Sequence, residues 1–558
     1  MKILDLGKTR LTFLPLLLIP LIALFFVNPA SAATPFTPPA PTAVLHMSTV
    51  SPDVIPLGGG SPVGGVPFCS SGSLGTIICY PASFLKSAYN FPSTTGKHGL
   101  NGAGQTIVIV DAFGSPTIQS DLNTYDTTFG LPATTITILC GPTWTGALTD
   151  TCPVTTIADL TTAPNALVCG ATGWAEETTL DVTMAHSLAP AAHIVLVVAN
   201  DCFDSSIYAA ELAVVNQPQY KGSVMSQSFG EPDDLVTCTT LDPTGSYCIA
   251  SDPTLLNLPN QVFETALLNH WTVIASSADD GANENINYLS CVLTPTCLAL
   301  TPSFPATNPL VLSAGGTQGN PYGGQYGPPP GPGGIFTCAA HTTCNTGLVE
   351  INGGANGCTT AARPAVPSSC VPVGYGGEST WNEFSSLYSF ESGYTLASSG
   401  GGFSSLYGIP LYQLLVRHTY TTVLGNTVKA TGRMTPDVSF NSAINGGFGP
   451  VWLGFLAGGD WAVFGGTSAA SPAWAGILAL ANQANGRPLG YINPQIYLIG
   501  LANPITHAFH DITSGNNAVC QTLCGEDGYL AGTGYDMTTG WGTPNVANLI
   551  NALTFSHY

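Results

Sequence analysis

Charged side chains are scarce in this chain of 558 residues: Asp, Glu, Lys and Arg make up 8% of it, against about a quarter in an average protein. Its 11 Lys and Arg residues are too few for the basic face that nucleic-acid binding requires, so we expect no nucleic-acid partner. The 32 Asp and Glu residues give a formal net charge of −21 at pH 7. Because carboxyl groups have ordinary pKa values of about 4, most of them would be neutral near pH 3. The composition is therefore compatible with an acidic medium.

Long apolar runs are also rare, and the only candidate for a membrane span lies at the N-terminus. The run Leu11–Val27 is shorter than the roughly 20 residues of a spanning helix, and Pro15 and Pro20 interrupt it. Basic residues precede it and the small residues Ala30-Ser31-Ala32 follow it, which is typical of a signal peptide over residues 1–32. We expect a secreted protein with no stable membrane span after cleavage, or a cell-surface protein if the segment is retained.

The sequence contains no Cys-x-x-Cys pair, which argues against zinc or thioredoxin-like sites. Its 16 cysteines suit an oxidising compartment and mostly local disulfides, although spacing alone does not settle their connectivity. As sequence neighbours they fall into the pairs 69/79, 140/152, 169/202, 238/248, 291/297, 338/344, 358/370 and 520/524.

The order of segments predicts one large domain. Residues 33–79 are rich in Pro and Gly and indicate a linker or a short pro-segment. From residue 80 to 558, short β-branched runs alternate with helical patterns, which favours a doubly wound α/β fold with a mostly parallel sheet and helices on both faces. Residues 318–376 are predicted to form a surface insertion. The expected strands are 106–110, 194–199 and 273–276, and the expected helices are 176–187, 207–216, 256–270 and 471–484.

Several strings could carry chemistry. In Gly465-Gly-Thr-Ser-Ala-Ala-Ser-Pro472, Ser468 would lie on a tight turn at a helix N-terminus, where a developing negative charge is favoured. Glu177 and Asp181 are four residues apart, so a helix would place them on one face, where they could share a proton. Asp279 follows an expected strand, at the edge where open α/β sheets bind ligands. A neutral carboxyl group there could donate a hydrogen bond to an oxyanion.

Two loops near the C-terminus carry oxygen atoms that could bind a metal ion. Asp511 and Asp536, together with main-chain carbonyls of a Gly-rich turn, form a donor set that suits Ca²⁺. An isolated pair of carboxylates in loops is also common without any metal.

Taken in order, these strings resemble the sedolisin family of serine-carboxyl peptidases, which have a subtilisin-like fold and act at acidic pH. The similarity extends from about Tyr80 to Pro544 and includes Ser228-Phe-Gly230, Gly400-Gly-Gly-Phe-Ser404 and Pro436-Asp-Val-Ser439. The resemblance implies that Ser468 is the nucleophile, Glu177 its general base, Asp181 the partner of Glu177, and Asp279 the oxyanion donor. It also implies one structural Ca²⁺ held by Asp511, Asp536 and the carbonyls of Ile512, Gly532 and Gly534.

The resemblance further implies an endopeptidase that acts on protein or peptide substrates, and we expect a monomer. This sequence departs from the family at Ala278, where Gly is usual, and in the short stretch before the domain, where a long pro-domain is usual. Two alternatives stay open at this point. One is a neutral subtilisin-like protease that uses Asp111 and a histidine, and the other is a non-catalytic surface protein with disulfide-stapled loops.

Overall fold

A computed structural model describes residues 48 to 554, with gaps at 50–53, 59–67, 72–74, 97–98, 143–145, 242–247, 285–299, 320–335, 339–371, 386–394, 445 and 519–526. Residues Val44–Tyr558 form one compact unit, separate from Met1–Ala43. The predicted signal peptide and most of the predicted insertion 318–376 lie outside the described residues.

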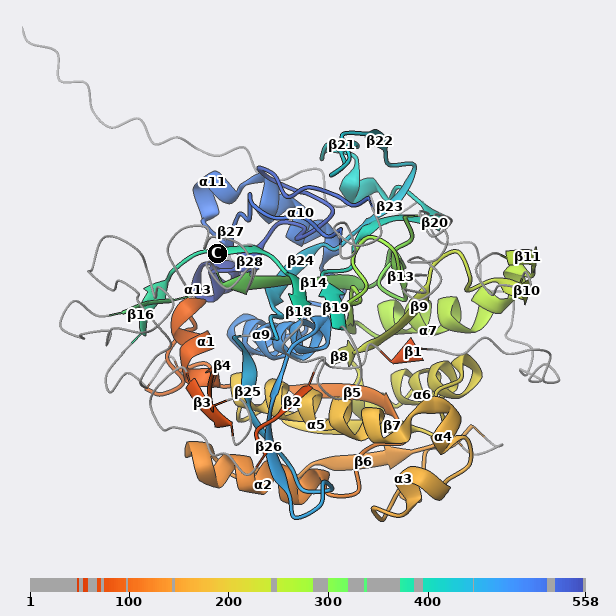
Figure 1. The fold of residues 1–558 in the computed structure, drawn as a ribbon, viewed down its shortest axis with the longest axis vertical. Coiled ribbons are helices and arrows are strands. Elements are labelled where there is room, and N and C mark those ends of the chain that lie inside the picture. Colours follow the sequence, from red (N-terminus) through yellow and green to blue (C-terminus); the bar gives the residue numbers. More distant parts are fainter. Residues whose placement is uncertain are drawn as a thin grey trace, which may run out of the picture. The chain divides into compact units, whose positions relative to one another are not determined.

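A sheet of eight strands forms the centre of this unit (Figure 1). Its strand pairs are parallel, except that β17 runs antiparallel to β14. The order along the main path is β17 (Glu378–Thr380), β14 (Leu312–Gly319), β12 (Thr272–Ser276), β8 (Val224–Gln227), β5 (Thr106–Ala112), β7 (His193–Ala199) and β6 (Thr137–Cys140), with β24 (Val438–Asn441) also paired to β14. The three strands expected from the sequence are confirmed. The physical reason is that a parallel sheet requires β-branched runs that are buried on both faces.

Helices cover both faces of this sheet. On one face, α5 (Ala171–Leu188) and α9 (Ala470–Asn485) pack against each other and against the central strands. On the other, α6 (Asp204–Val215) packs beside α7 (Asn257–Leu268). These helices confirm the four expected from the sequence, and the fold is the predicted doubly wound, mostly parallel α/β architecture.

A second sheet involves the segment predicted as a linker or pro-segment. Its strand β2 (Val54–Pro56) pairs with β26 (Asp460–Phe464), and β4 (Gly75–Tyr80) pairs with β25 (Gly447–Leu453). Strand β3 (Phe68–Ser71) forms a hairpin with β4. Part of the range 33–79 thus belongs to the same compact unit as the domain, and its removal during maturation stays a prediction.

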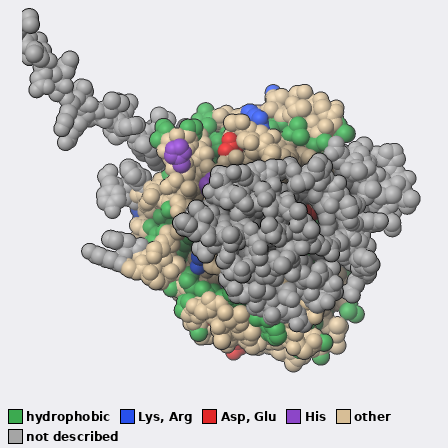
Figure 2. Space-filling model, turned by 60° about the vertical axis from the view of Figure 1, so that its left-hand side comes forward, with side chains coloured by type: hydrophobic (Ala, Val, Ile, Leu, Met, Phe, Trp, Pro, Cys, Tyr) green, Lys and Arg blue, Asp and Glu red, His purple; other side chains and the backbone are tan. Residues whose placement is uncertain are grey.

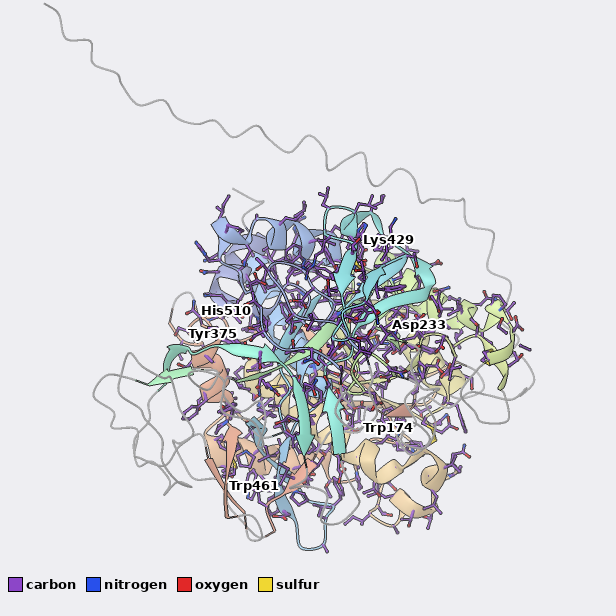
Figure 3. All side chains as sticks on the ribbon, turned by 45° about the horizontal axis from the view of Figure 1, so that its top comes forward. Trp174, Asp233, Tyr375, Lys429, Trp461 and His510 are labelled. Atoms are coloured by element: carbon purple, nitrogen blue, oxygen red, sulfur yellow. A yellow bond between two sulfur atoms is a disulfide. The ribbon has the colours of Figure 1, made fainter. Side chains whose placement is uncertain are left out.

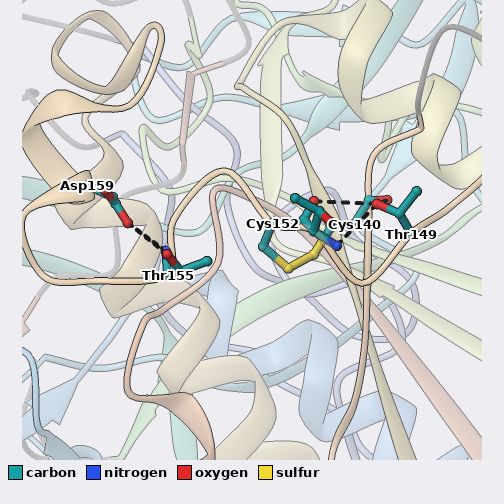
Figure 4. Close-up of a disulfide and its surroundings, with 6 residues drawn as sticks. Cys140, Thr149, Cys152, Thr155 and Asp159 are labelled. Atoms are coloured by element: carbon teal, nitrogen blue, oxygen red, sulfur yellow. Dashed lines mark hydrogen bonds between the residues drawn. A yellow bond between two sulfur atoms is a disulfide. The ribbon is translucent and has the colours of Figure 1, made fainter.

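Disulfides confirm four of the predicted local pairs: Cys69–Cys79, Cys140–Cys152, Cys169–Cys202 and Cys238–Cys248. Figure 4 shows Cys140–Cys152 closing a loop in which Thr149 also pairs through its backbone with Cys140. Beyond this loop, Asp159 accepts hydrogen bonds from the backbone of Thr155 and Thr156. Each of the other four cysteine pairs has at least one member outside the described part of the chain.

On the coloured part of the surface in Figure 2, charged side chains are scattered among many uncharged ones, as the composition predicts. Among the described residues, Arg433 and Asp437 form a buried ion pair at 2.6 Å, and the buried His186 ring lies 3.0 Å from the Asp126 carboxyl group. Among the helices that the structure describes, none has the length and apolarity needed to cross a membrane.

Candidate active site

Helix α5 brings Glu177 and Asp181 to one face, one turn apart, as their spacing predicts. Both side chains are fully buried. The helix begins after Gly170, whose φ of 67° ends the preceding short helix, and nearly all of its residues are inaccessible to solvent. A buried helix of this kind gives its two acids a fixed, low-dielectric environment.

Ser468 lies in the short helix η5 (Thr467–Ala469), between β26 and α9. Helix α5 contacts both η5 and α9. Ser468 is fully buried, and its hydroxyl is close enough to the Glu177 carboxyl group to lower that group's pKa. The chain thus brings together a serine and an acid that are 291 positions apart in the sequence.

Burial and mutual repulsion dominate the titration of these acids. Burial raises the pKa of Glu177 well above its ordinary value, and the negative charges of Asp181 and Asp111 raise it further. Burial and Asp111 raise the pKa of Asp181 in the same way, whereas a hydrogen bond from the Ser228 hydroxyl (3.0 Å) opposes the rise. Burial raises the pKa of Asp111 itself to about 7. Because these groups interact, each step in which the cluster loses a proton belongs to the cluster rather than to one residue.

Asp279 completes the cluster from the carboxyl end of β12. Its Oδ1 accepts hydrogen bonds from both the backbone N–H and the hydroxyl of Thr467, each at 2.7 Å. Burial raises its pKa to about 7, and its charge also raises the pKa of Glu177. Below pH 7 it is therefore a neutral carboxyl group beside the serine turn.

Gly466 allows the Asp279 side chain to lie close to the turn that carries Ser468. Its φ is +87°, and a Cβ atom placed there would lie 2.5 Å from Oδ2 of Asp279. Any side chain at residue 466 would therefore collide with the acid. Ala278 stands where Gly is usual in the resembled family. Its φ is 82°, in the left-handed region that favours glycine.

Two members of the cluster were not assigned to it from the sequence. Asp111 was weighed only as the acid of a histidine-dependent triad, yet the structure places it beside Glu177 and Asp181. Ser228 carried no role, although its hydroxyl contacts both Asp181 and, at 3.3 Å, the carbonyl oxygen of Ser468. The position of Asp111 at the end of an expected strand was the sequence signal for its place in the cluster. Nothing in the local sequence marks Ser228.

The predicted calcium ligands also converge. Asp511 accepts a hydrogen bond from the backbone N–H of Gly534 (2.9 Å), and Asp536 accepts one from Gly532 (2.8 Å), so both carboxylates flank one turn. Within the described ranges no three His, Cys, Asp or Glu side chains are grouped to hold a metal, so an ion here would also need main-chain oxygens, such as that of Ile512. Two carboxylates with carbonyls suit Ca²⁺, a hard cation.

Comparison with known proteins gives the following. No family model matches the chain. Kumamolisin of Bacillus sp. (strain MN-32) is 26% identical over 473 residues, which are 84% of this chain and 62% of the relative. Sedolisin of Pseudomonas sp. (strain 101) is 28% identical over 330 residues, 58% of this chain and 42% of the relative. The matches thus span less than two thirds of either relative's length.

The solved structure of Pseudomonas sedolisin, a serine-carboxyl proteinase, superimposes with a TM-score of 0.59 and 22% identity, covering 87% of this chain and 100% of that one. This likeness shows the fold. The chain has this subtilisin-like fold, with a serine turn beside buried carboxyl groups. In sequence it is similar to the serine-carboxyl peptidases kumamolisin and sedolisin.

Proposed function

We propose that the chain is a secreted serine-carboxyl endopeptidase that hydrolyses peptide bonds of proteins at acidic pH. The observation that carries this proposal is the cluster formed by the buried side chains of Ser468, Glu177 and Asp181 with the partly buried Asp279 beside them. The relatives described above support the reaction class.

In the proposed mechanism, Ser468 attacks the scissile carbonyl carbon while Glu177 accepts the hydroxyl proton. Asp181 shares a proton, and hence a negative charge, with Glu177. The hydrogen bond from the Ser228 hydroxyl positions Asp181. The leaving amine takes the proton back from Glu177, and water then hydrolyses the acyl-enzyme by the reverse proton path. A histidine base would be protonated near pH 4 and could not accept this proton. Burial raises the pKa of Glu177 as well, so Glu177 accepts the proton in the fraction of molecules in which it is ionised, a form that the hydrogen bond with Ser468 favours.

Asp279 is the proposed donor to the oxyanion of the tetrahedral intermediate. A carboxyl group donates a hydrogen bond only while it is protonated, and its raised pKa keeps it so throughout the acidic range. Removal of one such donor costs about 10²–10³ in kcat in other proteases. The same property would make the reaction fail as the medium becomes alkaline.

Calcium belongs to the proposal as a structural ion. Asp511 and Asp536, with the carbonyls of Ile512, Gly532 and Gly534, would hold it, and it would fix the C-terminal loops. The residues of the reaction cluster are distinct from this set, so the ion would supply stability rather than chemistry.

The test is digestion of a denatured protein between pH 2 and 8 by wild type and Ser468→Ala. We expect activity at acidic pH that Ser468→Ala abolishes. Ser471→Ala is the matched control, because Ser471 is also buried and bonds only to Ser226 (2.8 Å). Cleavage of N-terminally blocked peptides distinguishes an endopeptidase from a tripeptidyl-peptidase. Undiminished activity in Ser468→Ala, or an optimum at neutral pH, would contradict the proposal.

A further inference from the structure

Strand β9 (Phe229–Pro232) continues directly from the candidate active site. Ser228 precedes this strand, and the Ser228 hydroxyl contacts both Asp181 (3.0 Å) and the carbonyl oxygen of Ser468 (3.3 Å). Figure 1 shows β9 on the same side of the molecule as helix α6. Any displacement of β9 would therefore displace the hydrogen-bond donor of Asp181.

Glu231 of β9 is attached to α6 through a pair of carboxyl groups. Its side chain is buried and donates a hydrogen bond to the carboxyl group of Asp204, the first residue of α6. Two carboxyl groups can form such a bond only while at least one of them holds a proton. Just past β9, Asp233 (labelled in Figure 3) accepts hydrogen bonds from the hydroxyls of Ser404 and Ser405, each at 2.8 Å. Of these two attachments, only the carboxyl pair depends on a shared proton.

No basic side chain neutralises this pair in the part of the chain that the structure describes. The groups that act on it electrostatically are Tyr208 of α6 and Asp233, and Tyr208 in turn interacts with Glu211 and Tyr407. None of the strands packed against β9 carries a titratable side chain; they are β12, β1 (Ser48–Thr49) and β13 (Ser303–Phe304). The pair therefore lies among acids and hydroxyl groups.

The pair is also closed to water. Oε1 of Glu231, Oδ1 of Asp204 and the Tyr208 hydroxyl are inaccessible to solvent and have no hydrogen-bond partner among the described residues. Burial accordingly raises the pKa of Asp204 to about 7 and that of Glu231 well above its ordinary value. A carboxylate at this place would be neither paired nor hydrated, so the closed strand favours a protonated pair.

We propose that Asp204 and Glu231 are positioning residues that hold β9, and with it Ser228, in place while they are protonated, and that loss of their protons releases the strand and misaligns Asp181. This inference rests on the proposed peptidase function and concerns residues outside its reaction cluster. In an opened strand both acids would meet water and ionise at their ordinary pKa values of about 4. Opening therefore becomes more favourable as pH rises from about 4 toward the folded-state pKa of each acid.

Hydrogen exchange measures this opening without any need for activity. The backbone N–H of Asp233 donates to the carbonyl oxygen of Pro302 (2.9 Å) and reports on the end of β9. In Ser468→Ala, after correction for the intrinsic exchange rate, the opening equilibrium at this N–H should rise by up to about 100-fold per pH unit between pH 4.5 and 6.5, about tenfold from each acid. Glu231→Gln, whose amide still donates to Asp204, should reduce this slope to about tenfold. Adding Asp204→Asn should remove the slope.

Asp121→Asn is the matched control. Asp121 is also a buried acid, but it lies on α2 (Ile118–Phe129) and accepts a hydrogen bond from the backbone N–H of Gly454 (3.1 Å). Burial raises its pKa to about 6, so its removal changes stability against pH without touching the carboxyl pair. The pH slope at Asp233 should be unchanged in this variant. Equal slopes in Asp121→Asn and Glu231→Gln would overturn the inference.

Activity tests the consequence for the site. The ratio of kcat in Glu231→Gln to kcat in wild type at the same pH should rise about tenfold between pH 4 and 6.5, with little change in KM. Because Asp279 titrates in both proteins, this ratio isolates the carboxyl pair. Glu231→Ala, which cannot donate a hydrogen bond, should lose kcat at every pH, and Glu231→Gln should restore it. A ratio that does not change with pH would overturn the positioning role.

A second variant covers a failure to fold. If Glu231→Gln does not fold, Asp204→Asn alone should give the same reduced slope at Asp233, because either change leaves one acid in the pair. A slope as steep as in the parent protein would overturn the inference.

The two proposals fail in different ways. A steep slope at Asp233 in a chain that hydrolyses nothing at any pH would overturn the peptidase function, and the positioning role with it. A flat slope in a chain that digests protein at acidic pH would overturn the inference and leave the peptidase function standing.

Discussion

The Ser228 hydroxyl donates a hydrogen bond of 3.0 Å to Oδ1 of Asp181 and lies 3.3 Å from the carbonyl oxygen of Ser468. One side chain, directly after β8, thereby joins the Asp181 carboxyl group of α5 to the backbone of the Ser468 turn. It also opposes the rise in the pKa of Asp181. The alignment of acid and serine therefore depends on a third element.

Ser228→Ala should lower kcat by about 10- to 100-fold with little change in KM, because a hydrogen bond to a charged group contributes about 1.5–3 kcal/mol. The loss of this bond should also move the acidic limb of the pH–rate profile to higher pH, since the pKa of Asp181 would rise. Ser226→Ala removes a buried hydroxyl pair with Ser471 (2.8 Å) and serves as the control. Equal losses in both variants would assign Ser228 a merely structural role.

Asp279→Asn should change the alkaline limb. Burial raises the pKa of Asp279 to about 7, so the wild type loses its proposed donor as pH rises through 7. An amide donates at every pH, and the variant should keep part of the activity with a limb displaced to higher pH. Asp279→Ala should lose activity across the whole range. An unchanged alkaline limb in Asp279→Asn would show that another group sets it.

Ala278→Gly should stabilise the protein by about 0.5–1 kcal/mol. A left-handed conformation costs an L-residue about 1–2 kcal/mol, and the greater freedom of glycine in the unfolded chain offsets part of the gain. Thermal unfolding measures the difference, and Ala275→Gly in β12 should be destabilising by comparison. A lower melting temperature in Ala278→Gly would mean that the left-handed residue is not strained.

Arg417→Gln should strengthen stabilisation by Ca²⁺. The Arg417 guanidinium lies beside Gly532, where a Cβ atom would be 3.0 Å from it. Burial raises the pKa of Asp511, and the positive charge of Arg417 opposes that rise. Such a cation competes electrostatically with a bound metal. The increase in melting temperature on adding Ca²⁺ should be larger in Arg417→Gln than in wild type. Lys429→Gln, which removes an exposed charge, is the control. An equal response in all three proteins would contradict competition by Arg417, and no response in any of them would contradict the calcium proposal.

Glu211→Gln should reduce the loss of stability toward neutral pH. Burial raises the pKa of Glu211 to about 8, although its hydrogen bond with Gln227 opposes the rise. An acid whose pKa is higher in the folded than in the unfolded state stabilises the folded protein fully at a pH below its unfolded-state pKa. This stabilisation is lost as pH rises through the folded-state pKa. Wild type should therefore lose melting temperature between pH 4 and 8, and Glu211→Gln should lose less of it. Parallel pH curves for the two proteins would contradict this assignment.

Other buried polar groups have structural roles that the sequence did not indicate. Figure 3 shows Tyr375 beside His510, and their rings stack with centroids 3.7 Å apart. Glu378 accepts hydrogen bonds from the hydroxyls of Tyr89, Thr317, Tyr375 and Thr543. A carboxyl group with this many donors stays in the core without a charged partner, because each lone pair is satisfied.

The alternation of strands and helices could be predicted from the amino-acid sequence, since apolar periodicity is local and survives as secondary structure. The common helix face of Glu177 and Asp181 could be predicted as well, because four residues complete about one turn. Which distant groups meet depends on the packing of the folded chain. The sheet order brings Asp111, Ser228, Asp279 and Ser468 to one edge, and burial there raises the pKa values of Asp111 and Asp279. The pairing of β1 with β9 was equally invisible in the sequence, because a two-residue strand has no periodicity and is specified entirely by its partner.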